Sequence, residues 1–184
     1  MTITTRLFTV EDLAKMPGDE PWELWEGELR QVPGAGGMAS GLAGRILVML
    51  SLYVWPRDLG WVTGADGTFV LGRNPDTVVV PDVAFVRWER LPERRPPDTY
   101  IPVPPDLAVE VLSPSDGPRD IAAKMERYTR AGVPLVWWVH PKRRTVAVYH
   151  GGQLVAELRE GDELDGGDVL PGFGLPVAEI FAGV

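Results

Sequence analysis

The sequence contains no cysteine among its 184 residues. Disulfide bridges, thiolate zinc sites and cysteine nucleophiles are therefore excluded. Lysine is also scarce, since it occurs only at positions 15, 124 and 142, so most basic residues are arginine. Absent cysteine, scarce lysine and abundant proline are typical of a heat-adapted composition, and we expect a thermostable protein.

Long apolar segments and a positive net charge are absent as well. No run approaches the roughly 20 apolar residues that span a bilayer, and the opening segment lacks signal-peptide features, so we expect a cytoplasmic protein without a membrane segment. The formal charge of −8 argues against a protein that coats nucleic acid with its whole surface. Two local basic patches fit either nucleic-acid contacts or solvated turns: Arg87, Arg90, Arg94 and Arg95, and Lys142, Arg143 and Arg144.

The length fits one domain over residues 1–184. Apolar spacing and turn signals predict a hairpin at 21–32 that turns at Glu26-Gly27, and a core helix over 40–54 that Ser40 caps. Thr9 and Asp12 predict a capped helix before the hairpin. Strands are predicted at 61–63, 68–71, 78–86, 107–112, 135–139, 145–150 and 153–158, with helices at 118–131 and near the C-terminal end. This order indicates an α/β or α+β mixed-sheet protein.

One acid interrupts the apolar strand predicted at 107–112. Glu110 shares a face with Ala108 and Leu112 because side chains alternate along a strand. A rotation of about 100° per residue places Lys124 at the edge of the apolar stripe of the next helix. Since a strand and the helix that follows it normally pack together, we expect Glu110 and Lys124 to face each other.

Asp82 interrupts the neighbouring apolar run in the same way, directly after Pro81. Carboxylates on rigid strands suit Mg²⁺ or Mn²⁺, and a lysine beside such an ion can stabilise charge that develops at a phosphate, which points to phosphodiester hydrolysis. A structural ion pair between Glu110 and Lys124, with Asp82 as a turn residue, fits the same spacing. If the site is functional, Glu110 should lie at a strand end within reach of water.

Four ordered segments extend this pattern: "WELWEGEL", "VVVPDVAFV", "PPDLAVEVLSPSD" and "DIAAKMERYTRAGVPLVWWVHP". Together they resemble the putative restriction endonuclease family of the PD-(D/E)XK nuclease superfamily, long catalogued as a domain of unknown function. The resemblance covers roughly residues 22–149. It implies a restriction-endonuclease-like fold, in which helices flank a central mixed sheet and the active site lies where adjacent strands diverge.

The resemblance also implies roles for particular residues. Asp82 and Glu110 would bind Mg²⁺ or Mn²⁺ together with the backbone carbonyl of Val111, and Lys124 would be the catalytic lysine. In the N-terminal hairpin, Glu23 or Glu28 would support the metal or face solvent, and the "Gly-Glu-Leu" segment makes Glu28 the better match. The implied activity is that of a metal-dependent endonuclease that acts on DNA as a homodimer, because the cutting of two strands favours a two-fold assembly.

Three departures from the superfamily or family pattern matter, and of these the absent histidine, together with the net negative charge, favours a function without catalysis. The superfamily's usual lysine position, two residues after the strand acid, holds Leu112, and Lys124 would replace that lysine from the helix. The segment before the first core helix lacks the histidine that relatives often carry. His140 stands where relatives usually have an acid, and we interpret it as a strand-end residue. The alternative function is therefore a catalytically inactive nuclease fold that binds nucleic acid or another protein.

Overall fold

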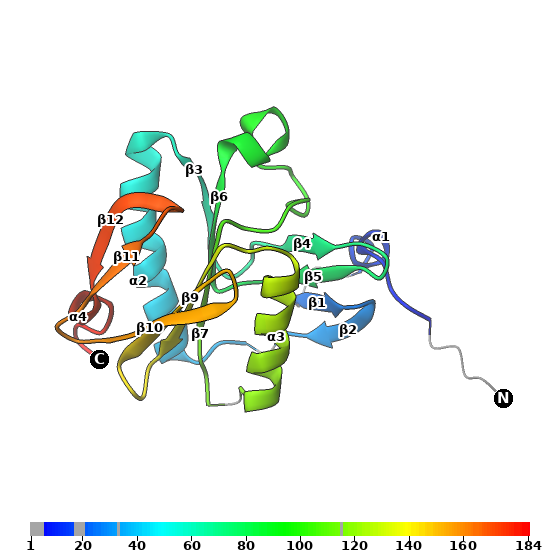
Figure 1. The fold of residues 1–184 in the computed structure, drawn as a ribbon. Helices are drawn as coiled ribbons and strands as arrows, with labels where there is room; N and C mark the ends of the chain where they lie inside the picture. Colours follow the sequence, from blue (N-terminus) through cyan, green and yellow to red (C-terminus); the bar gives the residue numbers. More distant parts are fainter. Residues whose placement is uncertain (1–5, 17–20, 33, 115) are drawn as a thin grey trace.

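A six-stranded mixed sheet forms the centre of the computed structural model, which describes residues 6–16, 21–32, 34–114 and 116–184 (Figure 1). Its strand order is β10-β9-β8-β7-β6-β3. β7 and β8 run parallel, and the other neighbours are antiparallel. The strands are β3 (Gly60–Thr63), β6 (Val83–Arg87), β7 (Leu107–Val111), β8 (Leu135–His140), β9 (Thr145–His150) and β10 (Gln153–Arg159).

Helix α3 (Pro118–Arg130) makes the crossover between the two parallel strands β7 and β8. Pro118 occupies the first turn, where its missing N–H costs nothing. Gly132 follows the helix with a φ of 72°, a conformation that favours glycine after a helix C-terminus. The predicted start and stop of this helix are thus confirmed, and α3 begins a short loop after the strand that carries Glu110.

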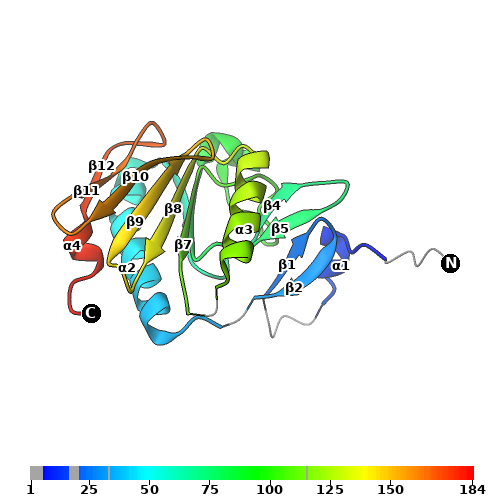
Figure 2. The same ribbon diagram turned by 60° about the horizontal axis from the view of Figure 1, so that its bottom comes forward.

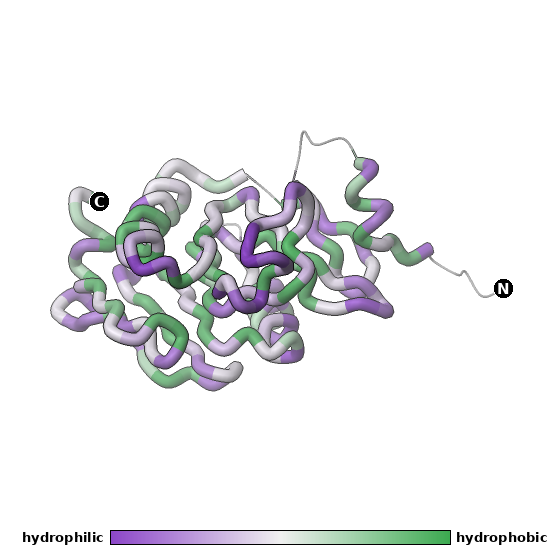
Figure 3. The backbone as a smooth tube through the Cα atoms, turned by 90° about the horizontal axis from the view of Figure 1, so that it is seen from above, coloured by the Kyte–Doolittle hydropathy of each residue, from purple (hydrophilic) through white to green (hydrophobic). Residues whose placement is uncertain are grey.

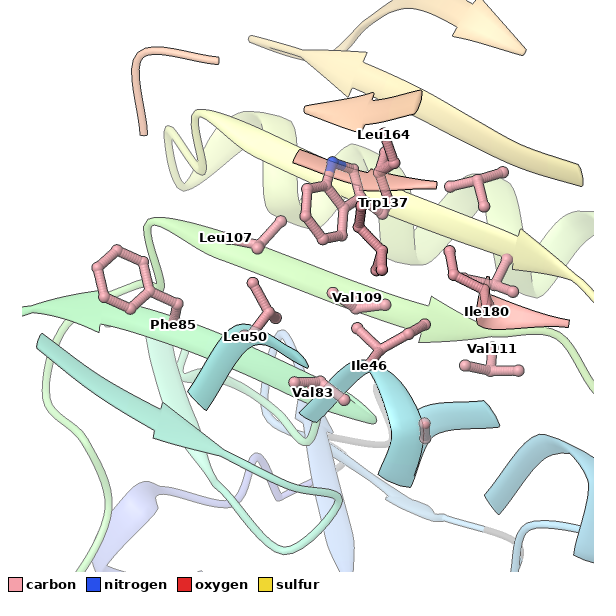
Figure 4. Packing of buried hydrophobic residues seen from close by; sticks show 14 of the residues in the cluster. Ile46, Leu50, Val83, Phe85, Leu107, Val109, Val111, Trp137, Leu164 and Ile180 are labelled. Atoms are coloured by element: carbon pink, nitrogen blue, oxygen red, sulfur yellow. The ribbon is translucent and has the colours of Figure 1, made fainter. Parts of the chain in front are cut away.

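The two faces of the central sheet are covered by different helices (Figure 2). Val109 and Trp137 face α2 (Gly37–Val54), whereas Ala108 and Trp138 face α3, as strand alternation requires. Figure 4 shows apolar side chains of the strands gathered beside Ile46 and Leu50 of α2. This face is completed by β11 (Glu163–Gly166), β12 (Leu170–Pro176) and α4 (Val177–Ile180).

A second sheet of four strands lies beside α3, in the order β2-β1-β5-β4 (Figure 1). The predicted hairpin is present, and Glu26 and Gly27 both adopt a positive φ at its turn. The capping box of Thr9 and Asp12 is also present at α1. The remaining elements are α1 (Val10–Leu13), β1 (Trp22–Trp25), β2 (Glu28–Gln31), β4 (Phe69–Gly72), β5 (Thr77–Val79) and the 3₁₀ turns Trp55–Arg57, Trp88–Arg90 and Pro92–Arg94.

Two predictions need correction, and one hairpin was not predicted. The core helix begins at Gly37 with Gly36 as its N-cap, so Ser40 lies inside the helix and does not cap it. The run predicted as one strand over 78–86 is two strands in different sheets, because the chain leaves β5 after Val79 and enters β6 at Val83. The hairpin of β11 and β12 was not predicted, since its glycines and prolines suggest loops. The mixed sheet flanked by helices is as predicted, whereas a single domain over 1–184 stays a prediction.

The residues Gly37–Arg57 are long and apolar enough to cross a membrane by length and composition. Core helices of water-soluble proteins can be equally long and apolar. In the most apolar 18-residue stretch of this segment, 39% is buried inside the fold. Leu42, Ile46, Leu50 and Val54 pack against the central sheet. Seen from above, the backbone shows short hydrophobic segments interspersed with hydrophilic ones (Figure 3). We therefore describe α2 as the core helix of this fold.

Candidate active site

Asp82 lies at the break between the two sheets, directly before β6. Its Oδ2 accepts a hydrogen bond of 2.6 Å from the backbone N–H of Val111, the last residue of the neighbouring strand β7. The bond fixes this carboxylate at the strand end. Burial raises the pKa of Asp82, and the Val111 amide and the Lys124 ammonium oppose that rise.

Glu110 is the penultimate residue of β7, and its side chain faces α3. Its Oε1 accepts a hydrogen bond from the hydroxyl of Tyr128 and lies 2.8 Å from the Nζ of Lys124. Burial raises the pKa of Glu110 to about 7, although the Lys124 ammonium pulls in the other direction. Its position at the strand end is as expected. The residue is 6% exposed, so its access to water is limited to the cavity described below.

Lys124 projects from α3 between two buried carboxylates. Its Nζ lies 2.8 Å from Oε1 of Glu110 and 3.0 Å from Oε1 of Glu23. Burial alone would lower the pKa of Lys124, but the charges of these carboxylates raise it above its usual value. The expected approach of Lys124 to Glu110 is therefore present, and the ammonium stays charged.

Glu23, and not Glu28, takes part in this cluster. Glu23 in β1 is 5% exposed, and its carboxylate also accepts hydrogen bonds from Nε1 of Trp25 at 2.8 Å and from the N–H of Val80 at 2.9 Å. Glu28 in β2 is exposed and does not line the cavity, which corrects our preference for Glu28. The overlooked signal is that Glu23 interrupts the apolar strand "WELW" just as Glu110 interrupts "LAVEV", whereas Glu28 directly follows the turn.

Trp25 fixes the orientation of Glu23 from the neighbouring position on the same strand face. Its ring lies between two guanidinium groups, with the Cζ of Arg127 at 4.0 Å and the Cζ of Arg30 at 4.1 Å from the ring centroid. Arg127 is held in turn by Glu26 at the hairpin turn. These contacts connect the N-terminal hairpin to α3 and so determine where Glu23 meets Lys124.

A cavity of about 300 Å³ brings the cluster together with Asp82. Glu23, Asp82, Glu110, Val111 and Lys124 all line it. Among the described residues, no three acidic, histidine or cysteine side chains form a ready-made metal cage. Two carboxylates that open on one cavity nevertheless fit Mg²⁺ or Mn²⁺, which accept one or two carboxylates and retain several waters. A ligand role for the carbonyl of Val111 stays a prediction.

The other residues considered from sequence lie outside this cluster. Leu112 follows β7 and lines the cavity as an apolar wall. His140 ends β8 as expected, and it lines a different cleft; burial lowers its pKa. Arg144 binds Glu160 and the backbone carbonyl of Phe181, so it has a structural role.

Comparison with known proteins agrees with this architecture. A crystal structure described as a putative nuclease belonging to DUF820 from Anabaena variabilis superposes with a TM-score of 0.79 over 95% of this chain and 97% of the other, at 21% identity. At that identity the likeness establishes the fold. No curated protein matches the chain. The model of the Uma2 family, described as putative restriction endonuclease, matches residues 10–178, which is most of the sequence, and the chain therefore belongs to this family.

Proposed function

We propose that this protein is a divalent-metal-dependent endonuclease that hydrolyses phosphodiester bonds in DNA. The observation that carries the proposal is the buried Lys124 ammonium, which two carboxylates hold in a cavity shared with Asp82. A purely structural ion pair needs one acid for one base, whereas five carboxylates line this cavity beside two basic side chains, Arg30 and Lys124. The excess negative charge suits a bound cation.

Asp82 and Glu110 would hold Mg²⁺ or Mn²⁺ at the ends of two adjacent strands, and the amide of Val111 keeps Asp82 in place. When bound, the ion supplies Lewis-acid catalysis at a phosphoryl oxygen. Lys124 would stabilise the negative charge that develops on the phosphate, since Glu110 and Glu23 hold its ammonium in the same cavity. Glu23 acts through Lys124 and is a positioning residue.

The test is cleavage of supercoiled plasmid and of single-stranded DNA with Mg²⁺, with Mn²⁺ and with EDTA. We expect cleavage with either metal and none with EDTA. Asp82→Ala, Glu110→Ala and Lys124→Ala should each lower the rate at least about 100-fold, the scale on which loss of a transition-state contact acts. Glu28→Ala, an exposed acid of the same hairpin as Glu23, should retain full activity. Full activity in all three site variants would refute the assignment.

A second candidate is a catalytically inactive member of the fold that binds nucleic acid or protein. The pairing of Glu110 with Lys124 and Tyr128 at 6% exposure favours it, because a ligand must displace or share these contacts. DNA binding without cleavage under any of these metal conditions would select this candidate.

We also propose that the enzyme acts as a homodimer. Support comes from Val48 and Leu52 of α2 and from Trp55 directly after it, which are each more than half exposed and lie along one side of the helix. A helix face of this kind is apolar enough to pair with a second copy about a two-fold axis. A cytoplasmic location and heat adaptation stay predictions from composition.

A further inference from the structure

A second cleft, of about 630 Å³, adjoins the catalytic cavity. The two share the lining residues Ala39, Leu112 and Ser113, so they adjoin each other at the first turn of α2 and the end of β7. We call this second space the flanking cleft; the residues that line it are 36–39, 112–114 and 140–143. The proposed function gives the flanking cleft no role.

The walls of the flanking cleft are mainly apolar, and its rim is basic. Met38, Leu112 and the two prolines Pro114 and Pro141 form much of the lining. Lys142 and Arg143 are exposed, and among the described residues of the lining they are the charged ones. Arg143 lies 3.9 Å from Glu157 in an exposed pair, which contributes little and leaves the guanidinium accessible.

The charge of the flanking cleft contrasts with that of the catalytic cavity. Five carboxylates line the cavity beside two basic side chains, and the whole chain carries −8. A DNA strand that enters such a cavity needs compensating positive charge close by, because phosphate contacts with lysine and arginine provide most of the affinity for nucleic acids. Lys142 and Arg143 lie on the cleft that adjoins the cavity.

We propose that the flanking cleft is the subsite for the nucleotide next to the scissile phosphate of a DNA strand. Its apolar walls take the base and sugar of this nucleotide, and Lys142 and Arg143 contact the adjacent phosphate. The identity of the strand rests on the proposed function, but binding in the flanking cleft does not depend on cleavage.

Two variants test the flanking cleft, each with a matched control. Lys142→Glu with Arg143→Glu reverses the rim charge. Arg94→Glu with Arg95→Glu makes the same charge change at the end of the 3₁₀ turn Pro92–Arg94, where Arg94 also has an exposed partner, Asp58. Gly37→Trp fills the cleft, since a Cβ at Gly37 meets nothing within 4 Å. Gly41→Trp is its control one turn along α2, where a Cβ also meets nothing and the residue lies outside the cleft lining.

The measurement is fluorescence anisotropy of labelled 20-nucleotide single-stranded and duplex DNA in EDTA, where metal-dependent cleavage is absent. We expect the rim variant to weaken binding at least about tenfold and to reduce the slope of log K against log salt by about one to two, as loss of one or two phosphate contacts requires. Gly37→Trp should weaken binding at least about fivefold with an unchanged melting temperature. Both controls should stay within about twofold of the wild type.

Equal losses in the variants and their controls would overturn the proposal, because the effect would then come from net charge or helix disturbance. Absence of DNA binding by the wild type would overturn it as well. Displacement of the labelled strand by dTMP as readily as by an unlabelled strand would mean a mononucleotide site and would contradict a strand subsite. DNA binding that the cleft variants weaken, without cleavage by the wild type, would refute the endonuclease and support the subsite. Cleavage by the wild type, with binding that the cleft variants leave unchanged, would support the endonuclease and refute the subsite.

Discussion

Lys124 lies between two carboxylates that come from different sheets, Glu23 of β1 and Glu110 of β7. This geometry makes the three side chains depend on one another, because loss of one partner leaves a buried charge incompletely compensated. The interior position of Glu110 could be predicted from "LAVEV", and its approach to Lys124 from helical spacing. The interruption of "WELW" by Glu23 indicates a buried acid there as well. Its contact with Lys124 could not be predicted, because that contact depends on how the hairpin packs against α3, which no local pattern encodes.

Replacement of the buried Glu23 should cost more stability than replacement of the exposed Glu28 in the same hairpin. Glu23→Ala should lower the free energy of unfolding by about 3 kcal/mol, because it removes one partner of a buried ion pair and leaves the Trp25 indole N–H and the Val80 amide without their acceptor. Glu28→Ala should change it by less than about 0.5 kcal/mol, as expected for a surface position. Urea denaturation measures both, and equal effects would contradict the placement of Glu23.

The raised pKa of Glu110 predicts a pH dependence of stability. The folded protein holds this proton up to about pH 7, whereas the unfolded chain releases it near pH 4.5, so Glu110 makes the folded state less stable as pH rises through this window. Asp82, whose pKa is also raised, acts in the same direction. The stability of Glu110→Gln relative to the wild type should therefore rise by about 1–3 kcal/mol as pH increases from 4.5 to 7, whatever the difference between the two proteins at pH 4.5.

Chemical denaturation of the wild type and Glu110→Gln at several pH values in this range checks this prediction. The difference between the two proteins isolates Glu110 from the other titrating groups. A difference that does not change with pH would mean that Glu110 ionises in the folded protein as it does in the unfolded chain.

At the scale of elements, the break at Pro81 and Asp82 gives the site its position. Proline lacks the N–H that a continuous strand would need, and Asp82 uses its side chain to bind the amide of Val111. The chain therefore leaves one sheet and enters the other at this point. The composition of "VVVPDVAFV" predicts an extended run with an interruption, but the assignment of its halves to separate sheets depends on long-range pairing.

Strand β3 approaches β6 closely enough to require glycine at its first position. A Cβ at Gly60 would lie 2.1 Å from the carbonyl oxygen of Val86 and 2.6 Å from the ring of Phe85. Gly60→Ala should therefore lower the free energy of unfolding by about 3 kcal/mol. Gly72→Ala in β4 is the control, since its Cβ would meet nothing within 4 Å and should change stability by less than about 1 kcal/mol. Thermal denaturation compares them, and a neutral Gly60→Ala would contradict the close approach.

At the scale of the whole molecule, the exposed apolar side of α2 allows a direct test of the proposed homodimer. Light scattering coupled to size exclusion should give twice the mass of the chain for the wild type. Leu52→Glu with Trp55→Glu should give monomers, because each places a charge in the proposed interface. Leu154→Glu with Val155→Glu, on β10, is a control with equally exposed apolar residues and should stay dimeric. A monomeric wild type would refute the homodimer.

Much of the architecture could be predicted because its elements have strong local signals. The helix that follows β7 and the hairpin at Glu26-Gly27 depend on turn residues and periodicity, and both occur where expected. The hairpin of β11 and β12 escaped prediction because Leu164 and Phe173 are separated by glycines and a proline that indicate loops. Those apolar residues are recognisable as core only once α2 is in place.

The contact between Lys124 and Glu23 has a consequence for the order of folding. The two residues are about a hundred positions apart in the chain, and Glu110 reaches the same ammonium from a third element. The reactive arrangement therefore arises only after the N-terminal hairpin, β7 and α3 have all docked. A partly assembled chain lacks it, so the activity proposed for this site would require the complete fold.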